Sequence, residues 1–298
     1  MILRFGLLFS LAALLGNRVM SAEDNYPHPE MLVEPAALSR PDVARQFVIV
    51  DARARTQYDE GRIPGAVWAD AAAWAKGFKD GSDREGWAAR IGALGIGPDS
   101  KAVVYDNASL KDAARIWWIL RYWGVEDARL LNGNWIGWKT AGLPVETDRP
   151  KGPSPARFVA MPRSQRLATM DLLLDSLKDN SLQIVDARSE GEFCGIDKEM
   201  NKRGGAIPGA KHLEWIDLID KITQRFKSPD QLSKLFRDAG IDLERPTAAH
   251  CQSGGRASVM AFGMELMGAK AVRNYYASWA QWGNTDDTPI VPGQPKKK

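Results

Sequence analysis

Residues 48–53 read VIVDAR, and a nearly identical hexapeptide, QIVDAR, returns at residues 183–188. Two further landmarks recur in the same order, namely the tetrapeptide IPGA at residues 63–66 and 207–210 and a tryptophan pair at Trp135, Trp138 and Trp279, Trp282. Three landmarks that keep their order about 140 residues apart indicate a duplicated domain, since short solenoid repeats have far smaller periods.

The length and composition fit two globular domains. The chain has 298 residues, about twice the ~150 of an ordinary domain. Hydrophobic residues make up 44% and charged residues 26%, and no apolar run reaches the ~18 residues that span a bilayer. An integral membrane protein is therefore excluded. Two cysteines and three scattered histidines predict neither a disulfide framework nor a zinc site.

The first 22 residues have the features of a secretory signal peptide. Arg4 precedes an apolar stretch, FGLLFSLAALLG at residues 5–16, and the small residues Ser21 and Ala22 follow. This order is typical of a cleaved signal. We therefore expect a periplasmic or secreted protein that is free of the membrane after cleavage. An uncleaved anchor and an ordinary N-terminal helix are the alternatives.

The net charge gives no reason to expect a nucleic-acid partner. The formal value of +3 includes Arg4 and Arg18 of the N-terminal segment, which holds no acidic residue before Glu23. The mature chain is therefore close to neutral, whereas nucleic-acid-binding domains are usually strongly basic.

A proline-rich stretch separates the two copies. Residues 149–157 read RPKGPSPAR, with three prolines in nine residues. Such a stretch enters neither a helix nor a central strand, so we predict an extended linker. The chain then divides into a signal peptide, a first domain, a linker, a second domain and a tail, at residues 1–22, 23–148, 149–157, 158–290 and 291–298.

Short apolar runs alternate with longer helical patterns within each copy. The runs predict buried strands at residues 47–51, 102–105, 183–186 and 247–250. Helices are predicted at residues 113–123 and 256–267. This alternation indicates an α/β fold in which each domain is a parallel sheet with helices on both faces. The eleven tryptophans are expected to pack in the core and between the domains.

The stretch TAAHCQSGGRAS at residues 247–258 carries the chemistry. A strand runs into Cys251, and a loop that contains a glycine pair leads into a helix. The glycines let the backbone curl until several N–H groups point inward, and the helix adds the positive end of its dipole. Because this setting stabilises a thiolate, Cys251 is predicted to be a nucleophile without a general base. The adjacent His250 is expected to face the opposite side of the strand as a core residue.

The first copy differs at the same place. Residues 102–115 read AVVYDNASLKDAAR, so that Asp106 or Asn107 stands where Cys251 stands and the glycine pair is missing. A carboxylate forms no persulfide. The first domain is therefore predicted to lack this chemistry and to supply structure and a wall of the pocket.

Together, the motifs VDAR, IPGA and CQSGGR resemble those of the tandem-domain rhodanese family of thiosulfate and 3-mercaptopyruvate sulfurtransferases. The resemblance covers essentially the whole mature length. It implies two rhodanese-like domains with a catalytic pocket between them and no metal or organic cofactor. It also implies that a Cys251 persulfide moves sulfur from thiosulfate, or a similar small donor, to cyanide or a thiol.

The substrate-binding residues follow from the same resemblance. The backbone N–H groups of the loop would hold the charged sulfur, and Arg256 would dock the anion. The residues expected to bind the substrate are Gln252, Ser253, Gly254, Gly255, Arg256 and Arg203.

The chain departs from the family pattern near this loop. The family usually has a substrate-binding arginine where this chain has Glu192, which would repel a dianion, and Arg256 or Arg203 is expected to compensate. Arg203 is alternatively a solvated loop charge. Cys194 is either a resolving thiol that pairs with Cys251 on oxidation or a bystander.

Three other functions compete with a thiosulfate sulfurtransferase. Ser253–Gly254 partly fits the pattern of 3-mercaptopyruvate enzymes. A phosphatase or arsenate reductase is disfavoured because Cys251 to Arg256 spans six residues, whereas the related phosphatase loops have seven. A non-enzymatic sulfur carrier or redox partner also fits, and a protein that accepts sulfur is then a further partner class.

Overall fold

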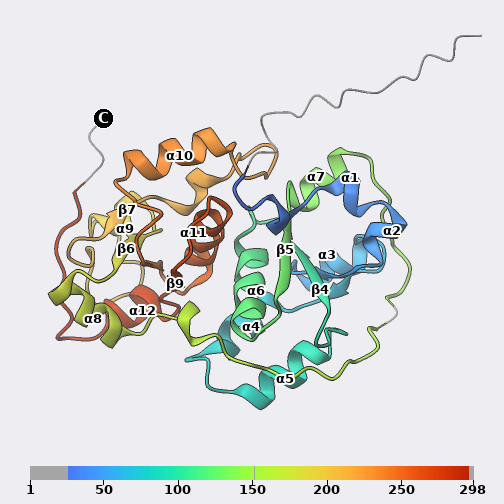
Figure 1. Cartoon of the computed structure of the whole chain (residues 1–298), viewed down its shortest axis with the longest axis horizontal. Coiled ribbons are helices and arrows are strands. Elements are labelled where there is room, and N and C mark those ends of the chain that lie inside the picture. Colours follow the sequence, from blue (N-terminus) through green and yellow to red (C-terminus); the bar gives the residue numbers. More distant parts are fainter. Residues whose placement is uncertain (1–25, 151, 295–298) are drawn as a thin grey trace, which may run out of the picture.

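The computed structural model describes residues 26–150 and 152–294 and places the two halves of the chain side by side (Figure 1). Each half is built on one sheet in which all neighbouring strands are parallel. The first sheet has the order β1-β5-β4-β2-β3, with strands Leu32–Val33, Asp127–Leu131, Lys101–Tyr105, Phe47–Asp51 and Val67–Trp68. The second has the order β7-β6-β8-β9, with strands Lys211–His212, Gln183–Asp186, Thr247–His250 and Val272–Asn274.

Helices cover both faces of each sheet, as the alternation of strands and helices predicted. The helices of the first half are α1 (Pro35–Leu38), α2 (Pro41–Ala44), α3 (Arg55–Glu60), α4 (Ala71–Phe78), α5 (Arg84–Gly92), α6 (Lys111–Tyr122) and α7 (Asn134–Thr140). Those of the second half are α8 (Met170–Asp179), α9 (Glu190–Phe193), α10 (Pro229–Asp238), α11 (Gly255–Leu266) and α12 (Ser278–Trp282). None of the helices in the described ranges is long and apolar enough to cross a membrane.

Alternating strand residues explain the two covered faces. In the first sheet, Val50 and Val104 join a hydrophobic cluster with α4, α5 and α6, whereas Ile49 and Val103 join a second cluster with α1, α3 and α7. Successive strand side chains point to opposite faces, so a strand covered on both sides has apolar residues at successive positions. This is why the centres of the strands, such as residues 48–50 and 102–104, read as apolar runs, with a polar residue at one end of each strand.

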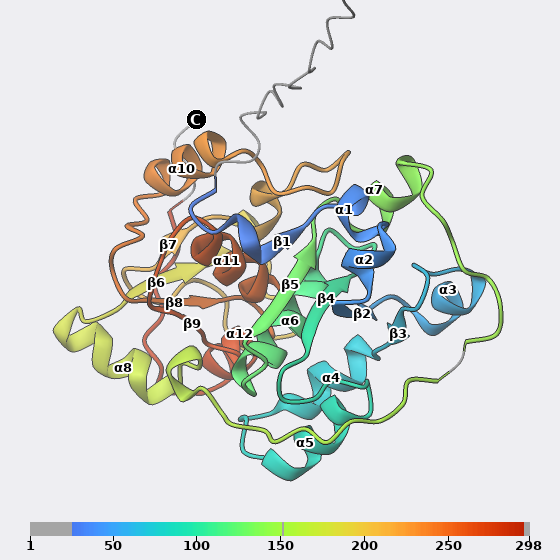
Figure 2. The same cartoon turned by 45° about the vertical axis from the view of Figure 1, so that its right-hand side comes forward.

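Helices α6 and α11 pack against each other at the junction of the halves (Figure 2). Trp117 of α6 meets Phe262 of α11 edge to face, with ring centroids 4.7 Å apart. Next to them, Trp118 stacks on Tyr276 at 5.3 Å. One hydrophobic cluster therefore runs through both halves, and the prediction that tryptophans pack in the core and between the domains is confirmed.

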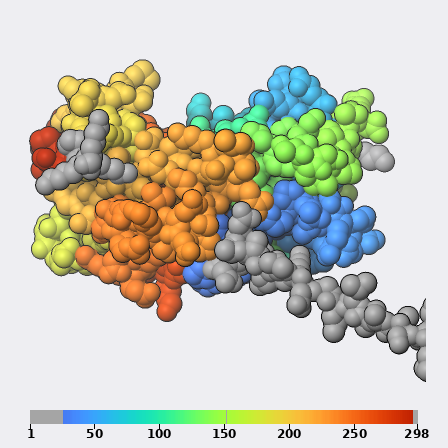
Figure 3. Space-filling model, turned by 90° about the horizontal axis from the view of Figure 1, so that it is seen from above, coloured from blue at the N-terminus to red at the C-terminus, as the bar shows by residue number. Residues whose placement is uncertain are grey.

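Segments from the chain ends and the linker tie the halves together. Residues 152–163 form no helix or strand and run along the first half, where Ala156 N–H donates to Gly92 O at 2.9 Å and Arg163 N–H to Tyr122 O at 2.7 Å (Figures 1 and 2). In the other direction, the hydroxyl of Tyr26 donates to Lys227 O at 2.9 Å. Figure 3 shows the two halves meeting along one continuous surface.

The ends of the described chain relate to two further predictions. Val291, which falls in the predicted tail, pairs with Ala206 through two backbone hydrogen bonds of 2.8 and 3.0 Å. The predicted signal peptide, residues 1–22, lies outside the described residues.

The contact between α6 and α11 predicts a large stability loss when its aromatic centre is removed. Phe262→Ala should lower the free energy of unfolding by about 3–5 kcal/mol, because it leaves a cavity in the cluster shared by both halves. Urea denaturation measures this change. Ile222→Ala is the control, since Ile222 is 85% exposed and should give less than about 0.5 kcal/mol. Equal losses for the two variants would contradict a packed junction.

Candidate active site

Cys251 lies directly after β8, and the start of α12 fixes its backbone. Its N–H donates to Ser278 Oγ at 3.0 Å, and its carbonyl accepts from Trp279 N–H at 2.9 Å. The Ser278 hydroxyl also lies 4.0 Å from the Cys251 sulfur. Cys251 is 1% exposed. Little of the residue is therefore in contact with solvent.

That loop presents a row of unused backbone donors. Within residues 26–150 and 152–294, no hydrogen bond uses the backbone N–H groups of residues 252–256. The last of these groups belong to the first turn of α11, a helix of twelve residues, and so lie at the positive end of its dipole. Free N–H groups at a helix start form a binding site for an anion. The unused donors therefore follow the cysteine directly, and their role as a cradle for an anion stays a prediction.

The glycine pair is needed to form this cradle. Gly254 has φ +82°, and a Cβ there would lie 2.6 Å from Cδ2 of Tyr276. A Cβ on Gly255 would lie 2.4 Å from a guanidinium nitrogen of Arg115. Gly254 thus combines a left-handed backbone with close approach of an aromatic ring, which favours glycine, whereas a side chain on Gly255 would displace the guanidinium of Arg115.

Side chains outside the loop hold its carbonyls. Ser253 O accepts from Arg115 Nη1 at 2.6 Å, and Gly254 O accepts from Asn274 Nδ2 at 2.9 Å. Arg115 comes from α6 of the first half and also donates to the Tyr276 hydroxyl at 2.8 Å. Because these carbonyls are engaged by outer groups, the N–H groups stay available to a ligand. The first half therefore supplies part of the wall, as predicted.

Arg256 forms a two-pronged ion pair with Glu192. The two nitrogen–oxygen distances are 2.5 and 2.8 Å. Burial opposes ionisation of Glu192, but the hydrogen bonds and charge of Arg256 outweigh it and keep the pKa of this carboxyl below its usual value. The charge of Glu192 is thus compensated by Arg256, one of the two arginines that the sequence suggested for this role. Ser189 also donates to it, through Oγ at 3.0 Å, at the start of α9.

Arg203, the second arginine expected at the site, is bound to the C-terminal segment. Its guanidinium donates to Trp282 O at 3.1 Å and to Thr288 O at 2.9 Å, with further short bonds to Thr285 O and the Thr288 hydroxyl. These bonds fasten residues 282–288 to the loop that carries Arg203. The predicted substrate-binding role of Arg203 gains no support from this geometry.

Gln252 also points its side chain at a neighbouring loop. Its amide and that of Asn201 exchange two hydrogen bonds, each of 3.1 Å. The contribution of Gln252 to the cradle is therefore its backbone N–H. The same holds for Gly254 and Gly255, which have no side chain to offer.

His250 is a buried core residue, as strand alternation predicted. Its ring is fully buried, stacks near Trp279 at 6.3 Å between centroids, and places Nε2 3.5 Å from an oxygen of Asp186. Burial lowers the pKa of His250 to about 4, against the raising effect of Asp186. The imidazole is therefore neutral at pH 7 and offers no positive charge to the site.

Cys194 ends helix α9 as a free, half-buried cysteine. Partial burial, and then the charge of Glu190, raise the pKa of its thiol. A raised pKa disfavours the thiolate that disulfide exchange requires. The resolving role of Cys194 stays a prediction.

The corresponding loop of the first half holds a carboxylate of the chain itself. Asp106 occupies the place of Cys251, and its carbonyl accepts from Trp135 N–H at 3.1 Å, just as that of Cys251 does from Trp279. The carboxylate of Asp106 accepts four backbone N–H bonds of 2.8 to 3.1 Å, from Ala108, Leu110, Asp112 and Ala113. An anion of the chain itself therefore fills the cradle of the first half, whereas the cradle of the second half is left for another anion.

Four residues that shape this site were missed in the sequence: Arg115, Asn274, Tyr276 and Ser278. One signal was available for Arg115, because an arginine within the apolar helix sequence AARIWWIL is buried and so needs polar partners. The other three are polar groups beside apolar residues, and nothing in the local sequence relates them to Cys251.

The geometry at Gly254 predicts a specific stability difference between two glycines. Gly254→Ala should cost about 1–3 kcal/mol more than Gly209→Ala, measured by denaturant unfolding. Both have positive φ, but only Gly254 has a side chain in the way, since nothing lies within 4 Å of a Cβ on Gly209. Equal losses would show that Tyr276 gives way freely and that the loop is not tightly held.

Comparison with known proteins gives one consistent result. The family model described as "Rhodanese-like domain" matches residues 35–141 and 169–285. Over 293 residues the chain is 33% identical to a thiosulfate sulfurtransferase of Corynebacterium glutamicum, covering 93% of this chain and 95% of that protein. It is 32% identical over 290 residues to the sulfur carrier protein TtuD of Thermus thermophilus, covering 90% and 99%.

A solved structure agrees with these relatives. The crystal structure of SseA from Escherichia coli, described as a 3-mercaptopyruvate sulfotransferase, matches with a TM-score of 0.73 and 28% identity. The match covers 84% of this chain and 98% of that one.

Proposed function

The chain belongs to the family of rhodanese-like domain proteins, and from this premise we propose that it is a sulfurtransferase that carries sulfur as a persulfide on Cys251. The observation that carries the proposal is the row of unused N–H groups at residues 252–256, directly after the cysteine. The matching loop of the first half holds a carboxylate in such a row, which supports an anionic occupant here.

The first half-reaction loads the cysteine. The Cys251 thiolate attacks the outer sulfur of thiosulfate, a bond forms between the two sulfurs, and the original sulfur–sulfur bond breaks. The bonding pair leaves with sulfite, and the enzyme keeps a persulfide whose negative charge rests on the outer sulfur. The cradle N–H groups stabilise that charge without any general base, in keeping with the neutral His250.

The second half-reaction unloads it. Cyanide or a thiolate attacks the outer sulfur, and the bond between the two sulfurs of the persulfide breaks. The acceptor leaves as thiocyanate or as a new persulfide, and the bonding pair restores the Cys251 thiolate. Such alternation predicts ping-pong kinetics. Since Cys251 is 1% exposed, donor and acceptor must be slender at the reacting end. The likeness to a sulfur carrier protein supports a protein thiol as a further class of acceptor.

Thiosulfate is the donor that we propose first, in line with the relative from Corynebacterium glutamicum. 3-Mercaptopyruvate is the alternative, supported by the structural likeness to SseA. We also propose that the mature protein works in the periplasm or outside the cell, on the basis of the signal-like sequence of residues 1–22.

Intact mass measurement tests the intermediate directly. After incubation with thiosulfate and removal of the donor, the protein should gain one sulfur atom, and the added sulfur should disappear on addition of cyanide. A parallel incubation with 3-mercaptopyruvate identifies which donor loads the protein.

The two cysteines provide matched variants for this measurement. Cys251→Ser should abolish the gain, whereas Cys194→Ser should load as the unchanged protein does. A gain that survives Cys251→Ser, or is lost in Cys194→Ser, would place the sulfur elsewhere and contradict the proposed mechanism. A persulfide that forms on Cys251 but passes slowly to cyanide and small thiols would instead favour the carrier function.

The ion pair between Arg256 and Glu192 predicts how charge tunes the donor. Glu192→Gln removes one negative charge beside Arg256, so the KM for the thiosulfate dianion should fall about ten-fold, with a smaller change in kcat. The fall should shrink at high salt. Glu190→Gln is the control, because Glu190 is exposed and lies two residues before Glu192, so the variant removes the same charge outside the ion pair. A KM that stays or rises in Glu192→Gln would indicate that Glu192 mainly positions Arg256.

A further inference from the structure

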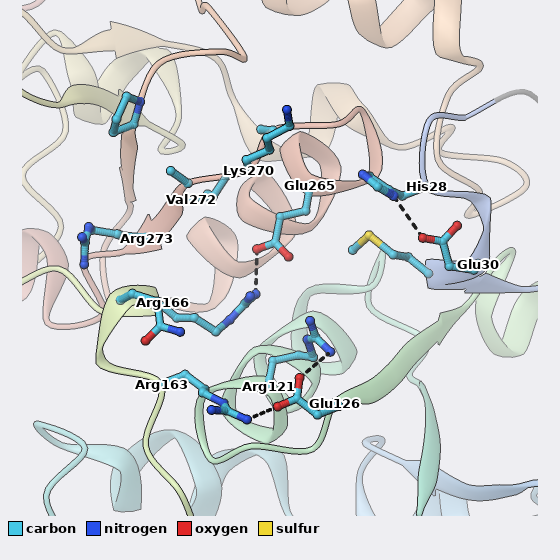
Figure 4. A pocket seen from close by; sticks show the side chains of 15 residues that line it. His28, Glu30, Arg121, Glu126, Arg163, Arg166, Glu265, Lys270, Val272 and Arg273 are labelled. Carbon is cyan, nitrogen blue, oxygen red and sulfur yellow. Dashed lines mark hydrogen bonds and ion pairs between the residues drawn. The ribbon is translucent and has the colours of Figure 1, made fainter.

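A groove of about 790 Å³ lies between the two halves, away from the catalytic loop (Figure 4). Its walls come from both halves, including the segment at residues 163–166 that follows the linker, and from the segment before β1. Arg121 and Glu265 line it near the C-terminal ends of α6 and α11. Since α11 starts at the catalytic loop, a helix rise of about 1.5 Å per residue puts Glu265 roughly 15 Å along the helix from that loop.

Cations outnumber carboxylates among the lining residues. Five side chains are basic, namely Arg121, Arg163, Arg166, Lys270 and Arg273, and three are acidic, namely Glu30, Glu126 and Glu265. Figure 4 shows Arg163 and Arg121 on either side of Glu126, and Arg166 against Glu265. The three carboxylates therefore leave the groove with an excess of positive charge.

Several of these basic groups have unused hydrogen-bond donors. Within the described part of the chain, Lys270 and Arg273 have neither an ion pair nor a side-chain hydrogen bond. Nε of Arg166 is buried and has no acceptor, although Nη2 reaches Glu265 at 2.6 Å. Arg121 makes only a loose ion pair, 3.9 Å from Glu126. Unpaired donors of partly buried guanidinium groups are costly, so an acceptor from outside would stabilise them.

The electrostatics of Arg121 agree with an excess of positive charge in the groove. Burial, and then the positive charge of nearby Arg166, lower its pKa. A helix C-terminus attracts a cation, which explains one basic residue at the end of each helix. It does not explain like charges that repel each other across the junction, or the half-buried Arg273, whose side chain has no partner in the described chain and lies on the facing wall beside the exposed Lys270.

We propose that this groove binds a small multivalent oxyanion, a molecule with two or more phosphate, sulfate or carboxylate groups, that bridges the two halves. The basic groups come from three separate segments, so one anionic group cannot serve all of them. Glu30, Glu126 and Glu265 lie between them and would repel the continuous phosphate backbone of a nucleic acid. The proposal is independent of the function assigned to Cys251.

Calorimetric titration of the mature protein with pyrophosphate tests the proposal, with phosphate and sodium chloride at equal ionic strength as comparisons. We expect one saturable site, tighter for pyrophosphate than for phosphate, and a higher melting temperature on binding, because the ligand ties the two halves together. Absence of saturable binding for all three salts overturns the proposal.

A pair of double variants locates the site. Lys270→Gln with Arg273→Gln should weaken pyrophosphate binding at least ten-fold without loss of folding, since neither residue has a partner to lose. Arg55→Gln with Lys178→Gln removes the same charge from exposed positions, with side chains 55% and 76% exposed, and should change the affinity less than two-fold. Equal weakening in both pairs would show a nonspecific charge effect and overturn the proposal.

Two further measurements distinguish the groove from the Cys251 cradle and from a nucleic-acid site. Binding that survives in the groove variant but is lost in Arg256→Gln would place the anion at the cradle and contradict the assignment. If the proposal holds, a single-stranded oligonucleotide should not bind this groove more tightly than pyrophosphate does. Tighter oligonucleotide binding to the unchanged protein, lost in the variant with Lys270→Gln and Arg273→Gln, would make nucleic acid the ligand and overturn the proposal of a small-anion site. Sulfur loading of Cys251 should be unchanged in the groove variant.

Discussion

A loop whose backbone N–H groups have no partner within the chain favours an anion, and this preference is met differently in the two halves. The first half meets it with the carboxylate of Asp106, which accepts four N–H bonds. The second half has Cys251 at that position and leaves its N–H groups without a partner in the described chain. The same loop thus has its N–H groups bonded to the chain itself in the first half and unbonded in the second. The difference rests on one side chain and a pair of glycines.

The copy without the cysteine is nevertheless part of the site. Arg115 reaches from α6 to hold Ser253 O and the Tyr276 hydroxyl, and the aromatic contacts of Trp117 and Trp118 fix the helix that carries it. An arginine buried at this junction needs acceptors, and the loop carbonyl supplies one. The shape of the cradle therefore depends on packing between the halves as much as on the loop sequence.

Local patterns predicted what depends on neighbours along the chain. The strands at residues 47–51, 183–186 and 247–250 agree with the structure to the residue, because a strand covered on both faces is mostly apolar and stands out from the polar turns that flank it. The cysteine loop was equally clear from its glycines. Contacts between distant residues were not predicted: Arg115 lies 138 positions from Ser253, and Glu192 lies 64 from Arg256. The sequence identified Glu192 as an unusual charge and named Arg256 or Arg203 as the compensating cation, but only the structure shows that Arg256 is the partner.

The crossing of chain segments between the halves bears on how such proteins can change. Tyr26, ahead of the first sheet, is fastened to the second half, while residues 156–163 lie along the first half before the chain leaves it. If the gene were cut at the linker, the first half would lose the contact with residues 156–163, and the second half would lose the contact with Tyr26. A duplicated unit of this kind is no longer an interchangeable module. Recombination that replaces one half by that of a distant relative must therefore also replace the segment of the other half that packs on it.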